Sequence, residues 1–412
     1  MSKPWTFIPT LYFTQGIPNT IINTVSPILY KRLGISNDQI TFWTSFLNLP
    51  WVLKMLWAPF IDTNSTKRTW MLITQFAMFA CLAFVAISLQ LPNFFFVSLI
   101  VFAIAAFISA TYDIATDGFY MLALSTEQQA FFVGFRSLFF RLAVLFGSGF
   151  LVFMAGKLEV YFQNVRLAWA AVFAFTALLF VLLFIYHRLI LPKPDYDIPN
   201  KSIENTKIPF AVIVSSYFSQ TKISAILAFL LLYRFGEAML VKLASLFLLD
   251  PINKGGLGLS TQTVGLVYGT FGVISLIAGG ILGGFIISRY GLKKCLLPMA
   301  LALNIPDIFY VYMAAAKPAL PFVYLLVSLE QFGYGLGFTA FTVYLLYLCK
   351  GEYKTSHYAI STGLMALGLM IPGAISGAIQ QQIGYTSFFI LVCILTIPGI
   401  ISIFFIPLDE SN

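Results

Sequence analysis

The stretch FFFVSLIVFAIAAFISATYDIATDGFYML (residues 94–122) decides how the rest of the chain is interpreted. Its first part, residues 94–112, carries no charge, and about 20 apolar residues are enough for a helix to cross the hydrocarbon core of a bilayer. The stretch then continues through Asp113 and Asp117, whose spacing of four places them on one face of a helix. It therefore predicts a membrane-spanning helix that holds two carboxylates.

The composition extends this interpretation to the whole chain. Of its 412 residues, 59% are hydrophobic and only 10% are charged, whereas about 25% of residues in soluble domains are charged. The net charge of +8 does not indicate nucleic-acid binding, because the basic residues lie mostly in short loops between apolar segments. The four cysteines are scattered and follow no metal-ligand or disulfide spacing, so we expect neither a metal site nor a disulfide framework. We also expect no cofactor.

Apolar segments long enough to cross a membrane recur along the chain. MSKPWTF (residues 1–7) runs into the first of them without a small-residue cleavage site, so we expect a first span and not a removed signal peptide. The loop lysines and arginines favour the side of the two termini, which predicts that both are cytoplasmic. The twelve predicted spans are residues 7–30, 38–60, 69–90, 94–124, 128–156, 165–190, 223–250, 261–288, 294–314, 320–349, 355–382 and 386–407.

The segments form two similar halves. A polar linker at 191–222 separates an N-terminal six-helix bundle (1–190) from a C-terminal one (223–412), and LGIS at 33–36 recurs as LGLS at 257–260. The linker also contains IPFAVIVSSYF, which could form a short helix on the membrane surface. This organisation resembles the major facilitator superfamily: an all-α polytopic membrane protein with twelve transmembrane helices in two pseudo-symmetric bundles and a substrate site near the bilayer midplane.

Charged residues within the predicted spans mark the candidate site. Each would cost about 2.5–3.5 kcal/mol at a lipid-facing helix centre, so together they would exceed a typical folding stability of about 5–15 kcal/mol. We therefore expect them to face the bundle interior and to pair where they can. They are Lys54, Arg136, Arg141, Arg234, Lys242, Asp113, Asp117, Glu237, Asp307 and Glu330.

Helix depth predicts which of these charges pair. Counted from the helix ends, Asp117 and Arg136 lie at the same depth of about 12 Å, and Asp113 and Arg141 lie at about 18–20 Å. Because the two arginines are five residues apart, about 140° around the helix, they cannot both face the acids squarely. An alternative is a permanent ion pair that only locks two helices together. Arg234 and Glu237 can pair within one helix, whereas Asp307 receives no role.

Chemistry suggests two roles for the charged set. A carboxylate beside an arginine in a low-dielectric site can alternate between protonated and paired states, and a planar guanidinium suits an anionic substrate. The expected proton-coupling residues are Asp113, Asp117, Glu237 and Glu330, and the expected substrate-binding residues are Gln15, Asn19, Asn23, Arg136, Arg141 and Arg234.

Two further groups of residues each have two possible roles. Gln15, Asn19 and Asn23 form a polar stripe that contacts either substrate or a neighbouring helix. Charges at the cytoplasmic ends of the second and eighth spans either gate the site or are ordinary positive-inside charges. The gating candidates are Lys54, Asp62, Lys67, Arg68, Arg289, Lys293 and Lys294.

Several motifs resemble those of the AmpG-type muropeptide permeases and of the related siderophore permeases. They are GIPN (16–19), LKMLWAPFID (53–62), ATYDIATDGF (110–119), FRLA (140–143), YRFGEA (233–238), LEQFGYGLGFTAF (329–341) and HYAIST (357–362). The resemblance places Lys54, Asp62, Asp113, Asp117, Arg141, Arg234, Glu237 and Glu330 at positions of family motifs. The loop NSTKRTW (64–70) departs from the arginine-rich family pattern, and Arg136 has no family counterpart.

These observations together predict a proton-coupled secondary transporter that imports a polar, anionic solute of the muropeptide type by alternating access. The alternatives are a siderophore importer or a drug or solute exporter. The sequence shows no catalytic motif such as HExxH, so we do not expect an enzyme. We also do not expect a receptor that lacks transport activity. We expect a monomer in the inner membrane, with protons, the solute and the bilayer as its partners.

Overall fold

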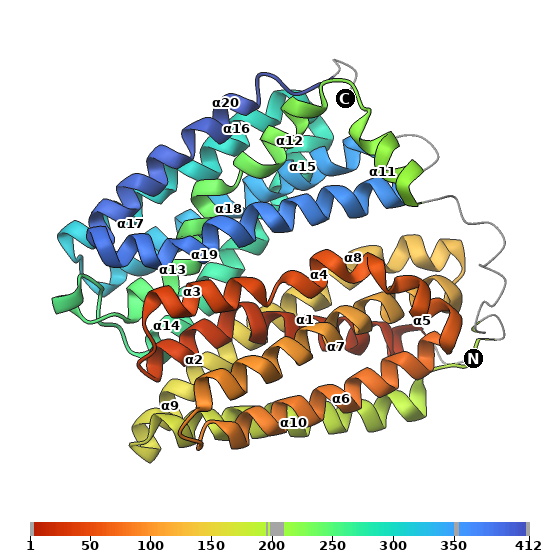
Figure 1. Cartoon of the computed structure of the whole chain (residues 1–412), viewed down its shortest axis with the longest axis horizontal. Helices are drawn as coiled ribbons and strands as arrows, with labels where there is room; N and C mark the ends of the chain where they lie inside the picture. The colour runs from red at the N-terminus through yellow and green to blue at the C-terminus, as the bar shows by residue number, and fades with distance from the viewer. Residues whose placement is uncertain (1–3, 195–196, 198–209, 350–353, 409–412) are drawn as a thin grey trace. The chain divides into compact units, whose positions relative to one another are not determined.

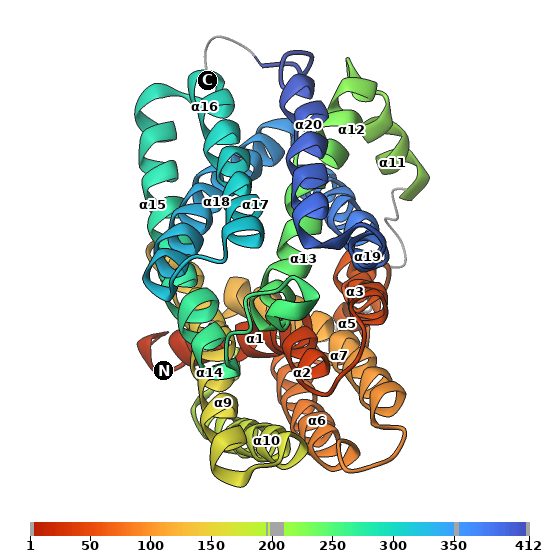
Figure 2. The same cartoon turned by 90° about the vertical axis from the view of Figure 1, so that its left-hand side faces the viewer.

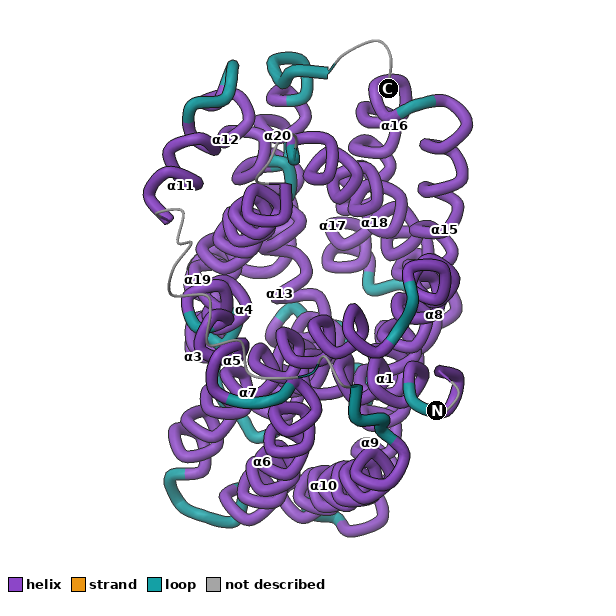
Figure 3. Tube along the Cα trace, turned by 90° about the vertical axis from the view of Figure 1, so that its right-hand side faces the viewer, coloured by secondary structure: helices purple, strands orange, loops and turns teal. Residues whose placement is uncertain are grey.

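The computed structural model describes residues 4–194, 197, 210–349 and 354–408, and every regular element in these ranges is a helix (Figures 1 and 3). The chain divides into two compact units. The first unit is Met1–Leu33 with Leu47–Thr206, and the second unit is Gly34–Phe46 with Lys207–Asn412. The division falls inside the linker predicted at 191–222, whereas residues 34–46 pack with the second unit. The exact extent of the two bundles remains a prediction.

The first unit contains, wholly or partly, three predicted spans that are divided into successive helical segments: 7–30, 38–60 and 128–156. The helices are α1 (Ile8–Thr20), η2 (Ile21–Val25), α2 (Ser26–Arg32), α4 (Leu49–Leu53), η3 (Lys54–Leu56), α5 (Ala58–Asn64), α6 (Lys67–Ser88), α7 (Phe94–Ala123), α8 (Thr126–Leu145), η4 (Phe146–Leu151), α9 (Val152–Phe162) and α10 (Val165–Ile190). Helix α7 packs against α6, and α1 packs against α8. The segments η2 and η4 are π-helical, a geometry that is frequent at functional sites.

The second unit contains the remaining spans. Its helices are α3 (Asn37–Phe46), α11 (Phe210–Phe218), α12 (Ile223–Leu232), α13 (Phe235–Leu249), α14 (Thr261–Val264), η7 (Gly265–Gly272), α15 (Val273–Tyr290), α16 (Leu292–Asn304), η8 (Ile305–Asp307), α17 (Ile308–Ala316), α18 (Leu320–Leu348), α19 (Lys354–Leu395) and α20 (Ile397–Ser402). Helix α18 packs on both α15 and α16, as Figure 2 shows.

The observed helices account for all twelve predicted spans. Within the described ranges, eight helical runs are long and apolar enough to cross a membrane. One of them, His357–Ser402, contains two predicted spans, which divide at Gly384, where φ is +76°. The other three predicted spans correspond to α1–η2–α2, to α3–α4–η3–α5 and to α18.

Large apolar side chains on the outside of the helices are consistent with this membrane fold. Ile281 is 70% exposed and Ile100 is 61% exposed, although both lie in candidate spans. Exposed aliphatic side chains at this density would be unfavourable in water.

Glycines let α18 approach its neighbours closely. A Cβ atom at Gly335 would overlap the carbonyl oxygen of Leu276 on α15, and one at Gly333 would overlap that of Ala302 on α16. The glycines after Glu330 therefore serve helix packing.

Candidate functional site

The two acids of α7 lie in different surroundings. Asp113 is 8% exposed, whereas the side chain of Asp117, one turn away, is 42% exposed. Both belong to a set that we call the acidic cluster, made up of Asp113, Asp117, Lys54 and Arg136. All four residues belong to the first unit. The cluster thus has one enclosed acid and one open acid.

Asp113 is held by the interrupted second span. The Nε1 of Trp51 on α4 donates to the Asp113 carboxylate at 3.0 Å, and the Nζ of Lys54 in η3 lies 3.8 Å from the same oxygen. Gln15 of α1 also interacts with Asp113. Because Pro50 lies at the start of α4, it begins a short helix that brings Trp51 and Lys54 to α7.

The sequence prediction for Asp113 named a different partner. The predicted pairing with Arg141 stays a prediction, and Lys54, expected as a gating residue, lies at Asp113. The sequence analysis overlooked Trp51. The sequence feature that could have identified Trp51 is its position near the in-span Lys54, since the indole N–H of a buried tryptophan usually finds a hydrogen-bond acceptor.

Asp117 forms the predicted pair with Arg136. The Nη2 of Arg136 lies 2.7 Å from the Asp117 carboxylate, and the hydroxyl of Tyr12 donates to the same oxygen at 3.2 Å. The guanidinium also lies over the rings of Tyr12 and Tyr120, at 4.7 and 4.5 Å from their centroids. The depth argument is confirmed for this pair, although the two tyrosines were not foreseen. Aromatic faces orient a guanidinium and leave part of its edge available.

The polar stripe of the first span carries unsatisfied acceptors. Gln15 is 8% exposed, and neither its Oε1 nor the Oδ1 of Asn23 has a hydrogen-bond partner among the described residues. Asn23 lies in the π-helical segment η2. Unpaired buried oxygens are costly, so this stripe is suited to receive a donor from elsewhere. Whether Gln15, Asn19 and Asn23 contact substrate stays a prediction.

A buried polar network lies beside the acidic cluster. The side chain of His187 on α10 contacts Gln75 on α6 at 2.8 Å and Thr10 on α1 at 2.9 Å. The Nε2 of Gln75 donates to the hydroxyl of Tyr112, which precedes Asp113 in α7, at 3.0 Å. Four helices are thereby fixed around the acids. The sequence analysis gave His187 no role.

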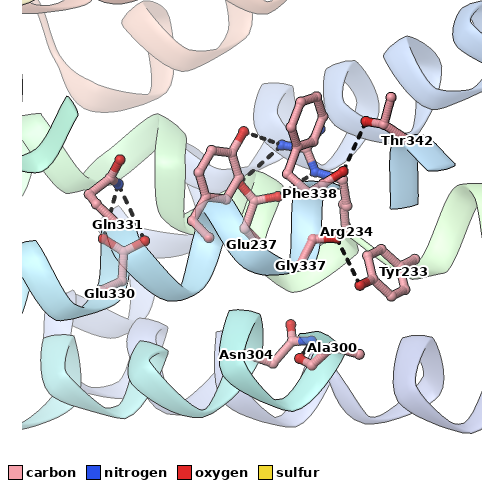
Figure 4. Close-up of polar contacts among 11 residues, drawn as sticks. Tyr233, Arg234, Glu237, Ala300, Asn304, Glu330, Gln331, Gly337, Phe338 and Thr342 are labelled. Atoms are coloured by element: carbon pink, nitrogen blue, oxygen red, sulfur yellow. Dashed lines mark hydrogen bonds and ion pairs between the residues drawn. The ribbon is translucent and has the colours of Figure 1, made fainter. Parts of the chain in front are cut away.

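The second unit contains a buried group that we call the arginine cluster: Arg234, Glu237, Tyr334 and Phe338. The Nε and Nη2 of Arg234 donate to the two Glu237 carboxylate oxygens at 2.8 and 3.2 Å, and Nη2 also donates to the Tyr334 hydroxyl at 2.6 Å (Figure 4). Its guanidinium lies 4.9 Å from the centroid of the Phe338 ring. The predicted pairing of Arg234 with Glu237 is confirmed. Both are at most 5% exposed.

Glu330 lies near this cluster on α18. Its carboxylate accepts a hydrogen bond from Gln331 Nε2 at 3.0 Å (Figure 4). It also accepts one from the Tyr310 hydroxyl at 3.4 Å, and Glu330 is 1% exposed. Glu330 is therefore an enclosed acid held by neutral donors.

The gating candidates of the first unit engage the linker. The backbone N–H groups of Lys67 and Arg68 donate to the Asp197 carboxylate at 2.7 and 3.0 Å, which is a favourable position for an anion at a helix N-terminus. The side chain of Asp62 lies outside the described residues. Arg289, Lys293 and Lys294 lie at the end of α15 and the start of α16, and their gating role stays a prediction.

Comparison with known proteins identifies the architecture. The sequence profile of the Major Facilitator Superfamily matches residues 10–250 and 210–412. The anhydromuropeptide permease of Escherichia coli (strain K12) is 24% identical over 400 residues, which cover 95% of this chain and 77% of that one. The putative transporter AmpG 4 of Rickettsia felis is 23% identical, covering 95% and 93%.

A solved structure shares the fold. The crystal structure of a D-xylose-proton symporter superposes with a TM-score of 0.71 at 12% sequence identity, covering 99% of this chain and 98% of that one. At such low identity the likeness shows the fold alone.

Proposed function

The chain belongs to the major facilitator superfamily, and from its in-span charges we propose that it is a proton-coupled importer of an anionic solute of the anhydromuropeptide type, working by alternating access. Membership in this family makes it a polytopic membrane transporter of small molecules. The proposal adds the coupling ion, the substrate class, the direction of transport and the residues that act. A siderophore of similar charge is the alternative substrate, and export is the alternative direction.

The Asp117–Arg136 pair carries this proposal. The side chain of Asp117 is 42% exposed and that of Arg136 is 29% exposed, whereas those of the Arg234–Glu237 pair are 6% and 1% exposed. When Asp117 takes up a proton it loses its negative charge and releases Arg136. The guanidinium is then free for a substrate carboxylate, which suits its planar donor geometry. Loss of the proton restores the pair and expels the substrate.

The other predicted site residues have supporting roles in this scheme. Asp113 orients Lys54, while Gln15, Asn19, Asn23 and Arg141 are proposed to contact the polar parts of the substrate. Arg234 already donates to Glu237 and Tyr334, and in this scheme it turns to a substrate when Glu237 is neutralised. We place both termini in the cytoplasm of a monomer in the inner membrane, with Lys54, Asp62, Lys67, Arg68, Arg289, Lys293 and Lys294 controlling access.

The test is Asp117→Asn in proteoliposomes that contain the purified chain. With an imposed pH gradient, we expect wild type to accumulate labelled anhydromuropeptide and the variant to lose accumulation while still exchanging substrate across the membrane at equilibrium. A ferric siderophore and a neutral sugar, tested in parallel, distinguish the alternative substrates.

Glu159→Gln provides the matched control. Glu159 also forms an arginine–carboxylate pair in the first unit, with Arg32 at 3.0 Å, and accepts from Trp169 at 2.9 Å, but it has no proposed part in coupling. This control should accumulate substrate like wild type. If Asp117→Asn accumulates substrate in response to the gradient as wild type does, the coupling role of Asp117 is wrong.

A further inference from the structure

Asp307 is a fully buried acid for which the proposed cycle has no use. It ends η8, between α16 and α17, inside the candidate span Leu292–Ala316. It is 0% exposed, and neither carboxylate oxygen accepts a hydrogen bond from any described residue. A buried carboxylate that is ionised and has no donor is among the costliest states of a side chain. Asp307 therefore requires a positive partner.

Asn304 presents a third unsatisfied oxygen next to it. Its Nδ2 donates to the carbonyl oxygen of Ala300 at 2.8 Å, while its Oδ1 is buried and has no partner among the described residues. Asn304 precedes Asp307 by three residues across a 3₁₀ turn, and such a turn places both on the same face. Figure 4 shows Asn304 on the helix α16 below the helix that carries Glu330. One face of this segment thus carries three acceptor oxygens and lacks a donor.

The groups around Asp307 do not supply a positive charge. Those that interact with it electrostatically are Glu330 on α18, Glu237 on α13, Tyr310 on α17 and Cys393 on α19. None of these four is a base. The guanidinium of the arginine cluster is already shared between Glu237 and Tyr334. Because none of the described groups that act on Asp307 is cationic, a ligand from outside the protein is the candidate partner.

We propose that Asp307 and Asn304 form a cation site of the second unit and that its ligand is one proton. The proton bonds to one carboxylate oxygen of Asp307, which becomes neutral, and the new O–H donates to Oδ1 of Asn304. One proton thereby satisfies two buried groups. A metal ion such as Ca²⁺ takes six or more oxygen ligands, and the described residues contain no cluster of three or more metal-ligating side chains.

This site adds a second proton-binding position to the cycle, apart from Asp117. The role of this site in transport rests on the proposed proton coupling. The binding of a proton to Asp307 does not depend on that proposal, because a bound proton is measurable without any substrate.

The test is infrared spectroscopy of the purified full-length chain in lipid at neutral pH, in H₂O and in D₂O. Wild type should show a C=O stretching band of a protonated carboxylic acid that shifts in D₂O, and Asp307→Asn should lose it. The matched control Glu330→Gln removes a neighbouring buried acid and should retain it. Because asparagine is isosteric with a neutral aspartic acid, Asp307→Asn should unfold at the wild-type temperature.

Two further measurements keep the test decisive if Asp307→Asn folds poorly. Asn304→Ala removes the acceptor, so the band should move to higher frequency without disappearing. Replacing choline chloride with sodium chloride should leave the band unchanged. Any one of three results overturns the proton assignment: the band persists in Asp307→Asn, it does not move in Asn304→Ala, or sodium abolishes it.

Transport then separates this inference from the proposed function. In proteoliposomes, the number of protons moved per substrate should fall by one in Asp307→Asn. If the band behaves as expected but wild type shows no proton-driven uptake, the proton site stands and the proposed function fails.

Discussion

At the scale of single residues, the charged groups inside the spans are not equivalent. Asp117 and Arg136 form an exposed pair, Arg234 and Glu237 form an enclosed pair, and Asp307 has no described partner. The desolvation cost of an ion pair rises with burial, so the exposed pair opens most readily. The proposed switching role of Asp117 and the proposed proton on Asp307 both rest on this difference.

Trp51 should stabilise the ionised form of Asp113. Trp51→Phe keeps an aromatic ring but removes the 3.0 Å hydrogen bond to the carboxylate, and a hydrogen bond to a charged group contributes about 1.5–3 kcal/mol. We expect a free energy of unfolding lower by about 2 kcal/mol, measured by denaturation of the purified protein in detergent.

Trp57→Phe is the matched control for this substitution. Its indole N–H donates to the neutral hydroxyl of Thr111 at 3.1 Å, so the loss should be smaller, at about 0.5–1.5 kcal/mol. Equal losses in the two variants would contradict an ionised Asp113.

Residue-level prediction from the sequence worked where helix geometry alone decides. The match of Asp117 with Arg136 follows from the rise per residue in two regular helices. The partners of Asp113 could not be found this way, because the second span is interrupted at α4 and η3. The position of the Lys54 side chain therefore does not follow from the geometry of one regular helix. The role of Asp307 was also hidden, since an unsatisfied oxygen is defined by its neighbours and not by its position in the sequence.

At the scale of helices, the packing of the second unit depends on the close approach of α15 and α16 to α18. The sequence predicted the spans, because apolar length is the dominant signal. It predicted a break between residues 382 and 386, where Gly384 divides the helix, but not the interruptions at Leu47–Asn48 and Lys54–Leu56, since the geometry of a break depends on tertiary contacts.

Gly335→Ala should destabilise the packing of α18 on α15. The new methyl group would overlap the carbonyl oxygen of Leu276, which is rigid backbone, so we expect a loss of about 1–3 kcal/mol in the free energy of unfolding. Gly284→Ala on α15 is the control, because a Cβ there meets no atom within 4 Å. It should leave stability unchanged or raise it, since alanine favours helix by up to about 1 kcal/mol. A Gly335→Ala protein as stable as the Gly284→Ala protein would show that α18 and α15 can separate at little cost.

At the scale of the whole molecule, twelve spans and basic loops predict the orientation in the membrane. An even number of spans places both termini on one side, and the excess of lysine and arginine on that side favours the cytoplasm. Asp197 is fixed to the first unit, since its carboxylate accepts hydrogen bonds from the backbone N–H groups of Lys67 and Arg68 at the N-terminus of α6.

Reporter fusions test this orientation. Green fluorescent protein should fluoresce when fused after residue 412 or inserted at 64–66, because both positions are predicted to be cytoplasmic. Alkaline phosphatase, which requires an oxidising compartment to form its disulfides, should be active when inserted at 90–93, between α6 and α7, and inactive at the other two positions. Activity at the C-terminus together with inactivity at 90–93 would reverse the orientation. It would then place the Asp197 contact on the outer side, and the imposed pH gradient of the uptake assay would have to be inverted.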